Sequence, residues 1–481
     1  MKGWRSDLPA LFFCARATSL AHMIRTTMLA AAALLFATPA TAQSIPQSEL
    51  DDRYDRALAA GYKALFLCGA LANTEIGLGR SDEDILASEL SGIQPPLDMI
   101  AAELEHTIYR FERDGDPLSH VAVAWAEDMP PRIAFHMEEG GCSLLPIGAT
   151  TFPDRSSVSF SDAAIVWTQR ELADPDLGPV FERAFSDHYG ADARTTAVLV
   201  RGHAEHDDER YAAPYSPYSP QRTWSVAKSI AATIVGAAVQ RGDIDVNESA
   251  GLGADETDPR RAITIDHALR MASGRYSDTP GNRTDPLYYG GATVDEVALD
   301  WPLLFAPGTM YRYANNDTLA AVQAIEHTFA DHPPADLFET LDMGRTIAET
   351  DWQGNYILSS QVWATARDLA NLGQLHLQDG MWRGERILPE GWVDYITTPS
   401  GPQPSNTAWG YGAGWWLANG NLQGVPADMF AARGNRGQYL VVIPSENLII
   451  VRRGEDPAGG SGFDIVAFTA DVLSALNNEG G

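Results

Sequence analysis

Residues 224–242 read WSVAKSIAATIVGAAVQRG, and no other stretch limits the possible folds of this chain so strongly. From Ser225 to Arg241 the residues are apolar or small on nearly every side, and Gly242 follows. The stretch therefore predicts a buried helix that begins at Ser225 and ends before the glycine. A lysine one turn into a helix with no exposed face is costly to bury. Lys228 is therefore a candidate functional residue.

Ser225 and Lys228 are suited to nucleophilic catalysis. Their spacing of three residues puts both side chains on one face of the helix, about 5–6 Å apart. At that distance a lysine whose pKa is lowered by burial can accept or relay the hydroxyl proton. The backbone N–H groups at the helix start also favour an oxyanion. For these two residues alone, the alternative is an N-cap serine beside a lysine whose amine reaches solvent.

Runs on both sides of this helix predict a single sheet. A short helix and two strands precede it, and two strands and a closing helix come near the end of the chain. The two late strands are joined by residues 444–447 as an antiparallel hairpin. The runs are 180–188 (helix), 195–200 and 209–212 (strands), 438–443 and 448–452 (strands) and 463–476 (helix). They predict an α/β (α+β) domain over 165–481, in which both ends build one antiparallel sheet, terminal helices cover it and a helical subdomain is inserted.

A smaller mixed domain is predicted over residues 43–160. It has helix-like stretches at 51–67 and 81–90 and strand-like stretches at 121–125 and 132–136. Residues 146–162, rich in Pro, Gly, Ser and Thr, suggest a boundary. Cys68 and Cys142 both lie in this domain, and a disulfide between them is predicted, with two separate buried thiols as the alternative. No motif here specifies a role.

The first 42 residues are expected to be an export signal. An apolar run at 28–36 follows Arg25, and Ala40 and Ala42 supply small residues before a cleavage site. Nine to eleven apolar residues are too few to span a bilayer, so no membrane anchor is expected after cleavage. Translation starts either at Met1 or at Met23. The expected location is the periplasm or the exterior of the cell.

Composition and charge exclude several classes. The chain has 481 residues, 45% hydrophobic and 20% charged, which is typical of a globular protein. Its 34 Lys and Arg against 64 Asp and Glu give a net charge of -30. That field repels phosphate backbones and anionic lipid, so no nucleic-acid partner is expected. Nothing in the sequence indicates an oligomeric state.

The Ser-x-x-Lys pattern at a buried helix start resembles the nucleophile motif of the penicillin-recognising serine hydrolases, which comprise β-lactamases, D-Ala-D-Ala peptidases and related esterases and amidases. The class C-like branch has Tyr-x-Asn as its second motif, and this chain has Tyr313-Ala314-Asn315. The resemblance covers roughly residues 175 to 475. Further matching segments are 307–309, 319–322, 271–274 and 366–373.

This resemblance implies a β-lactamase/D,D-peptidase-like fold and a set of roles. Tyr313 would act as proton acceptor and donor beside Lys228. Asn315 would orient the lysine or bind the substrate amide. The alternative is a core tyrosine followed by a turn asparagine.

The family's third motif, Lys-Thr-Gly, is absent, and Ala432-Arg433-Gly434 stands in its place. With the following Asn-Arg-Gly-Gln, the pattern is similar to 6-aminohexanoate-dimer hydrolases and related carboxylesterases. In that subgroup the backbone N–H matching Asn435 joins that of Ser225 in the oxyanion hole. Losing the Lys and Thr weakens the case for β-lactamase or D,D-peptidase activity, unless Arg433 or Arg436 supplies the positive charge that binds a carboxylate.

Two further runs contain residue types that occur in metal sites or substrate clefts. The run 203–208, His-Ala-Glu-His-Asp-Asp, has metal-ligand types but no known metal-site spacing, and it falls at a predicted turn, so no metal is expected. The run 409–416 contains Trp409 and Tyr411 among glycines. These rings either line a substrate cleft or pack in the core.

Together these features predict an exported serine hydrolase that needs no cofactor. It would cleave an ester or amide bond of a small or peptide-like molecule through an acyl-enzyme on Ser225. The alternatives are a β-lactamase or D,D-peptidase, or a non-catalytic sensor of the same fold.

Overall fold

The computed structural model describes residues 44–74, 80–111, 117–137, 141–152, 168–202, 207–276, 284–460 and 462–477. From Asp52 onward these residues belong to one compact unit, to which the following description applies. The predicted signal segment lies outside the described residues, as do residues 203–206. None of the described helices has the length and apolar character needed to cross a bilayer.

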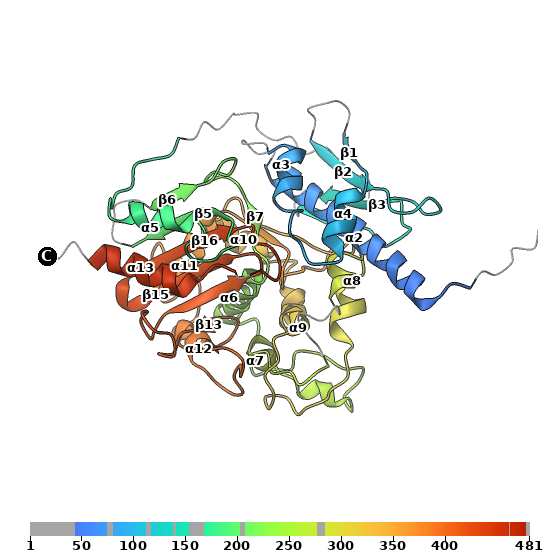
Figure 1. The fold of residues 1–481 in the computed structure, drawn as a ribbon. Helices are drawn as coiled ribbons and strands as arrows, with labels where there is room; N and C mark the ends of the chain where they lie inside the picture. The colour runs from blue at the N-terminus through green and yellow to red at the C-terminus, as the bar shows by residue number, and fades with distance from the viewer. Residues whose placement is uncertain are drawn as a thin grey trace, which may run out of the picture. The chain divides into compact units, whose positions relative to one another are not determined.

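A seven-stranded antiparallel sheet is the centre of the region that follows residue 168. Its order is β12-β13-β14-β15-β16-β5-β6. Strand β16, near the end of the chain, pairs with the early strand β5, with Ile450 opposite Val200 (Figure 1). The prediction of one antiparallel sheet built from both ends of this region is thus confirmed. The strands are β5 (Thr195–Arg201), β6 (Asp208–Tyr211), β12 (Gly410–Tyr411), β13 (Trp416–Leu417), β14 (Phe430–Gly434), β15 (Gln438–Ile443) and β16 (Leu448–Gly454).

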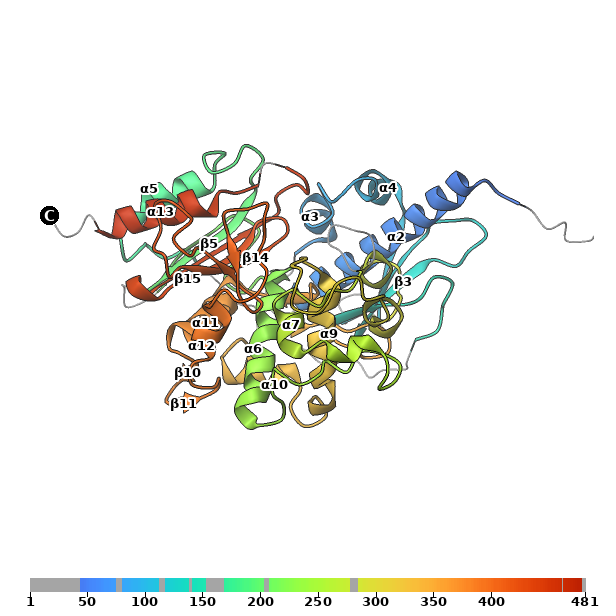
Figure 2. The same ribbon diagram turned by 90° about the horizontal axis from the view of Figure 1, so that it is seen from below.

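Helices cover both faces of this sheet (Figure 2). On one face lie α5 (Leu177–Ala184) and α13 (Ile465–Asn477), and on the other α6 (Val226–Arg241) and α11 (Ala366–Leu377). In β15, Leu440 and Val442 lie in the same apolar cluster as the side chains of α6. Val441 and Ile443 lie in a second apolar cluster, together with the side chains of α5 and α13. The strand is continuously apolar because both of its faces are buried.

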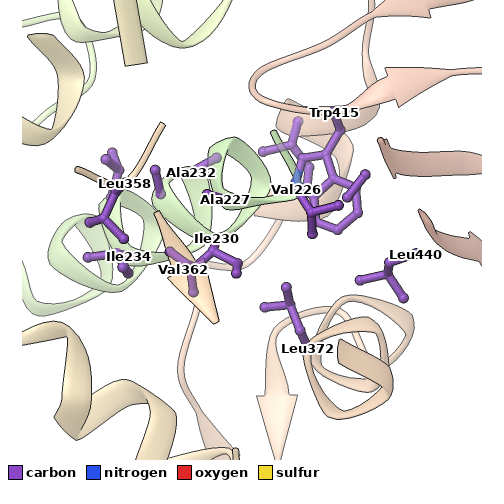
Figure 3. Close-up of a cluster of buried hydrophobic side chains, with 14 of the residues drawn as sticks. Val226, Ala227, Ile230, Ala232, Ile234, Leu358, Val362, Leu372, Trp415 and Leu440 are labelled. Atoms are coloured by element: carbon purple, nitrogen blue, oxygen red, sulfur yellow. The ribbon is translucent and has the colours of Figure 1, made fainter. Parts of the chain in front are cut away.

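Helix α6 is the buried helix that the sequence predicts. Ser225 is its N-cap, and Gly242 ends it at φ 82°, in the left-handed region that glycine adopts without a steric penalty. Residues Val226–Ala238 are all buried. Figure 3 shows the helix among apolar side chains from other elements, including Leu358, Val362 and Trp415.

Between β6 and β12 the chain forms a helical insertion with short strands. Its helices are α7 (Ile265–Leu269), α8 (Asp285–Tyr288), α9 (Asn315–Ile325), α10 (Pro334–Thr340) and α12 (Trp392–Thr397), besides α6 and α11. Strands β7 (Gln221–Arg222), β9 (Val362–Ala364) and β8 (Ile347–Ala348) form a three-stranded sheet, and β10 (Met381–Trp382) pairs with β11 (Glu385–Arg386).

The N-terminal segment, defined here as residues 52–152, has its own four-stranded sheet in the order β1-β2-β3-β4. The predicted disulfide is confirmed: Cys68 of α2 is bonded to Cys142 of β4, with their Cα atoms 6.0 Å apart. A division into domains at 43–160 and 165–481 stays a prediction, since residues 153–167 are not described. The elements are α2 (Gln47–Thr74), α3 (Asp82–Ala87), α4 (Leu97–Glu103), β1 (His106–Arg110), β2 (Leu118–Val123), β3 (Arg132–Met137) and β4 (Gly141–Leu144).

Candidate active site

Ser225 stands where the turn after β7 enters α6. As the N-cap it has φ -68° and ψ -5°, and its side chain caps no backbone N–H of the helix. Its Oγ instead accepts a hydrogen bond of 3.1 Å from Lys228 Nζ. The hydroxyl is therefore available to the lysine and is not needed to start the helix.

Lys228 is only 1% exposed. Its Nζ also donates to Asn315 Oδ1 and to the carbonyl oxygen of Ser359, both at 2.7 Å. No carboxylate of the described residues pairs with it, and burial lowers its pKa to about 7. At neutral pH a large fraction of Lys228 is thus the free amine, which can accept a proton from Ser225.

Tyr313 completes this group. The Nζ of Lys228 lies 5.2 Å from the centre of its ring. Burial raises the pKa of Tyr313 to about 12, although its hydrogen bond with Ser225 and the charge of Arg433 act in the opposite direction. Tyr313 is therefore a neutral phenol at neutral pH, able to donate its proton.

Asn315 opens α9 and is directed at the lysine. Its Oδ1 accepts from Lys228, while its Nδ2 donates to Thr284 Oγ1 at 2.9 Å. Ser359 is held in turn by a hydroxyl contact of 2.6 Å with Tyr288. Sequence reasoning missed Thr284 and Ser359, since no motif marks them.

The end of β14 passes close to Ser225. A Cβ placed on Gly434 would lie 2.4 Å from the carbonyl oxygen of Thr223 and 3.3 Å from the backbone N of Ser225, so only glycine fits. Among the described residues, the backbone N–H groups of Ser225 and Asn435 donate no hydrogen bond to the protein. Both residues line a cavity of about 350 Å³. The complete lining is Ser225, Tyr313, Asn406, Thr407, Trp416, Arg433, Gly434, Asn435 and Tyr439.

The structure separates the two arginines between which the sequence left a choice. Arg433 lines the cavity, with its guanidinium 4.7 Å from the ring centre of Trp409 and 5.2 Å from that of Trp416. No carboxylate within the described ranges forms an ion pair with it. Arg436 is 4% exposed and pairs with Glu455 at 3.1 Å, pointing away from the cavity. Of these two arginines, only Arg433 lines the cavity.

The aromatic run is divided between core and cavity. Trp409 and Tyr411 are 7% and 2% exposed and are not among the cavity residues. They lie behind Trp416, whose ring centre is 5.1 Å from that of Tyr411. A direct role of Trp409 and Tyr411 in substrate binding stays a prediction, and Trp416 is the ring of this run that faces the cavity.

Within the described part of the chain, no group of three or more His, Cys, Asp or Glu side chains is placed to hold a metal ion.

A Ser-x-x-Lys helix packed against a large antiparallel sheet, with Tyr-x-Asn beside it, defines the β-lactamase/D,D-peptidase fold. The model of the beta-lactamase family matches residues 181–452, more than half of the chain. This protein belongs to the beta-lactamase family.

Individual relatives agree with this placement. The chain is 26% identical over 294 residues to a 6-aminohexanoate-dimer hydrolase of Paenarthrobacter ureafaciens, covering 55% of this chain and 73% of that one. A Bacillus anthracis structure assigned as a 6-aminohexanoate-dimer hydrolase is 21% identical, with a TM-score of 0.51, covering 60% of this chain and 81% of that one. A family VIII carboxylesterase is 15% identical, with a TM-score of 0.50, covering 64% and 99%. At these identities the two structural likenesses show the fold alone.

Proposed function

We propose that this protein is an exported serine hydrolase that cleaves an ester or amide bond through an acyl-enzyme on Ser225. The observation that carries this proposal is Lys228: it is fully buried, has no carboxylate partner among the described residues, and lies 3.1 Å from the hydroxyl of Ser225. Burying a lysine in this way costs stability, and a catalytic role for its free amine accounts for its presence here. Export rests on the signal-like first 42 residues.

The geometry suggests how protons and bonds change. The free amine of Lys228 takes the proton of Ser225 as Oγ bonds to the substrate carbonyl carbon. The N–H groups of Ser225 and Asn435 stabilise the resulting oxyanion. Tyr313 gives its proton to the leaving oxygen or nitrogen as that bond breaks, and recovers one from the protonated lysine. Water then repeats the sequence on the acyl-enzyme and releases the acid.

The cavity favours substrates that carry a carboxylate. Arg433 is a cation at the lining with no carboxylate partner in the described structure, and an arginine suits a planar carboxylate. The relative from Paenarthrobacter ureafaciens is named for a dimer of 6-aminohexanoate, an ω-amino acid. We rank short esters first and ω-amino-acid amides second. We rank β-lactams last because the Lys-Thr-Gly motif is missing.

The decisive experiment compares the wild-type protein with Ser225→Ala. The variant should lose turnover and labelling by a fluorophosphonate while keeping its fold, since losing an N-cap side chain costs about 1 kcal/mol or less and this hydroxyl makes no cap. Substrates would be p-nitrophenyl esters, nitrocefin, a D-Ala-D-Ala peptide and a linear aminohexanoate dimer. Turnover by the alanine variant would refute the proposal, and nitrocefin cleaved faster than the esters would reverse the ranking.

Arg433→Gln tests the carboxylate. The variant should raise KM for an ester that carries a terminal carboxylate by about tenfold or more, since a hydrogen-bonded charge pair contributes about 1.5–3 kcal/mol. The KM for an uncharged ester of the same length, measured in parallel, should stay near that of the wild type. Equal effects on both esters would show that Arg433 only supports the cavity wall.

A further inference from the structure

The two proposed oxyanion donors stand beside two unusual backbone positions. Trp224, directly before Ser225, has φ 51°, and Arg436, directly after Asn435, has φ 57°. Residues with side chains rarely adopt this left-handed region. Something must therefore hold these two residues in place, and with them the directions of the neighbouring N–H groups.

Arg436 is held by the N-terminal segment. Its buried guanidinium donates to the carbonyl oxygens of Glu89 at 2.6 Å, Ser88 at 3.0 Å and Ser91 at 2.6 Å. These carbonyls belong to the short loop that follows the C-terminal end of α3. A residue of the turn between β14 and β15 is thus tied to a part of the chain some 345 residues away.

Those carbonyls are themselves fixed. Arg80 forms a buried ion pair with Glu89, and its guanidinium donates to Ser88 Oγ at 2.5 Å. On the other side, the N–H of Ala458 donates to the carbonyl oxygen of Gly92 at 2.8 Å. The loop whose carbonyl oxygens bind Arg436 is therefore held by contacts on both sides.

Trp224 is held by the same segment through α2. The ring of Phe66 lies 5.7 Å from that of Trp224. The guanidinium of Arg222 lies 4.5 Å from the ring of Phe66 and 4.2 Å from that of Trp224. Phe66 and Trp224 belong to one buried apolar cluster.

We propose that the N-terminal segment positions the oxyanion hole, with Phe66 acting through Trp224 on the N–H of Ser225 and Arg436 acting on the N–H of Asn435. Both are positioning residues, because neither reaches the cavity. The inference rests on the proposed acyl-enzyme function and assigns to residues 52–152 a part in it. Arg436 is also bound by Glu455 and by the carbonyl oxygen of Asp456, so the N-terminal segment supplies part of what holds this left-handed position.

Phe66→Leu and Arg436→Lys test this inference in the full-length protein. Leucine keeps the apolar contact but loses the ring, and lysine keeps the charge beside Glu455 but loses the planar fork. Phe135→Leu is the matched control, since Phe135 is also 1% exposed but packs within the N-terminal segment, on Phe152. Each protein is assayed on a p-nitrophenyl ester and on its thionoester, whose sulfur accepts hydrogen bonds weakly. Rates are normalised to the amount of protein that reacts with the fluorophosphonate. The thermal midpoint of each variant is measured to check that it is folded.

Both test variants should lose at least about tenfold in kcat on the ester, since complete loss of one oxyanion donor costs about a hundredfold or more. Their ratio of ester to thionoester rates should fall severalfold while KM stays nearly constant. Phe135→Leu should lower the thermal midpoint but keep the ratio. If Arg436→Lys does not fold, Phe66→Leu alone carries the test.

Three results would overturn the inference. An unchanged ratio in a folded test variant would mean that the contacts serve stability only, and the same fall in Phe135→Leu would mean that the effect is general. A wild-type protein that prefers neither substrate would have no working oxyanion hole. If the wild type hydrolyses no ester and is not labelled, the proposed function itself fails, and the inference fails with it.

Discussion

Lys228 combines two properties that rarely occur together. All three hydrogen-bond directions of its amine are occupied, by Ser225, Asn315 and the carbonyl of Ser359, so the charged form has partners. Yet burial without a carboxylate lowers its pKa to about 7. The site therefore stabilises the ammonium enough to accept a proton and destabilises it enough to release one again.

The pH profile should report this balance. Because the proposed mechanism needs the free amine, kcat/KM for an uncharged ester should fall about tenfold per pH unit below pH 7 and level off above it. Lys228→Arg should be nearly inactive at every pH, since a guanidinium stays protonated. A stopped-flow or steady-state profile measures both.

Lys63→Arg is the matched control, since Lys63 is buried too but, among the residues that the structure describes, its amine bonds only to the carbonyls of Ala101 and Leu104. It should leave the midpoint of the profile unchanged. A wild-type profile that is flat from pH 5 to 9, or a Lys228→Arg protein that retains most of its activity, would show that Lys228 serves only as a fixed charge.

Several elements are predicted from the sequence to within a few residues because local chemistry determines where they begin and end. Helix α6 has a serine N-cap and a glycine C-cap at its predicted ends. The β15–β16 hairpin is joined by residues 444–447 as predicted, with Ile443 opposite Leu448. Helix α2 continues to Thr74, beyond its predicted end at residue 67.

The disulfide between α2 and β4 should be a major source of stability. Cys68 and Cys142 are both 0% exposed, and their bond closes a loop with a sequence separation of 74. Chain-entropy estimates for such a loop give about 4 kcal/mol. A Cys68→Ala/Cys142→Ala variant should lose about that much free energy of unfolding in urea.

A reductant should lower the urea midpoint of the wild-type protein and leave that of the double variant unchanged, because the only other cysteine in the chain is Cys14. Activity should fall together with unfolding of the N-terminal segment and not before it. Two free thiols at Cys68 and Cys142 in the denatured, unreduced protein would contradict the bridge.

Glu349 is a buried carboxyl at which distant parts of the chain meet. Its Oε1 accepts from the backbone N–H of Cys142 at 3.1 Å, and a Cβ on Gly69 would lie 2.9 Å from the same oxygen. Burial raises its pKa to about 7, against the opposing effects of the Cys142 N–H and the charge of Arg222. The folded protein thus keeps this carboxyl protonated at pH values where the unfolded chain has lost the proton.

The stability of the whole molecule should therefore depend on pH through Glu349. The protonated Glu349 contributes to the free energy of unfolding. This contribution is fully present below pH 4.5, the ordinary pKa of a glutamate, and is lost as pH rises through about 7. Glu349→Gln, which keeps the oxygen acceptor, should match the wild type below pH 4.5 and be more stable above pH 7, by up to about 3 kcal/mol. Thermal midpoints across this range measure the effect. Glu339→Gln changes an exposed residue and should show no such difference. If the thermal midpoints of Glu349→Gln and of the wild type change with pH in parallel, Glu349 is not the source of the pH dependence.

The sequence by itself determined strands β5, β6, β15 and β16, helices α5, α6 and α13, and the group Ser225, Lys228, Tyr313 and Asn315. Helix caps, the period of apolar residues and the short motifs are local signals, and each can be read within a few residues. The same signals indicate Cys68 and Cys142 as partners, because only two cysteines lie beyond the expected signal segment.

Only the tertiary structure decided which of Arg433 and Arg436 faces the cavity, and that Trp416 lines it while Trp409 and Tyr411 lie behind it. It alone brought the carbonyls after α3 to Arg436 and the ring of Phe66 to Trp224. Neighbouring arginines and neighbouring rings have the same local chemistry, so their sequence context cannot tell them apart. What distinguishes them is packing between segments hundreds of residues apart, which periodicity does not record.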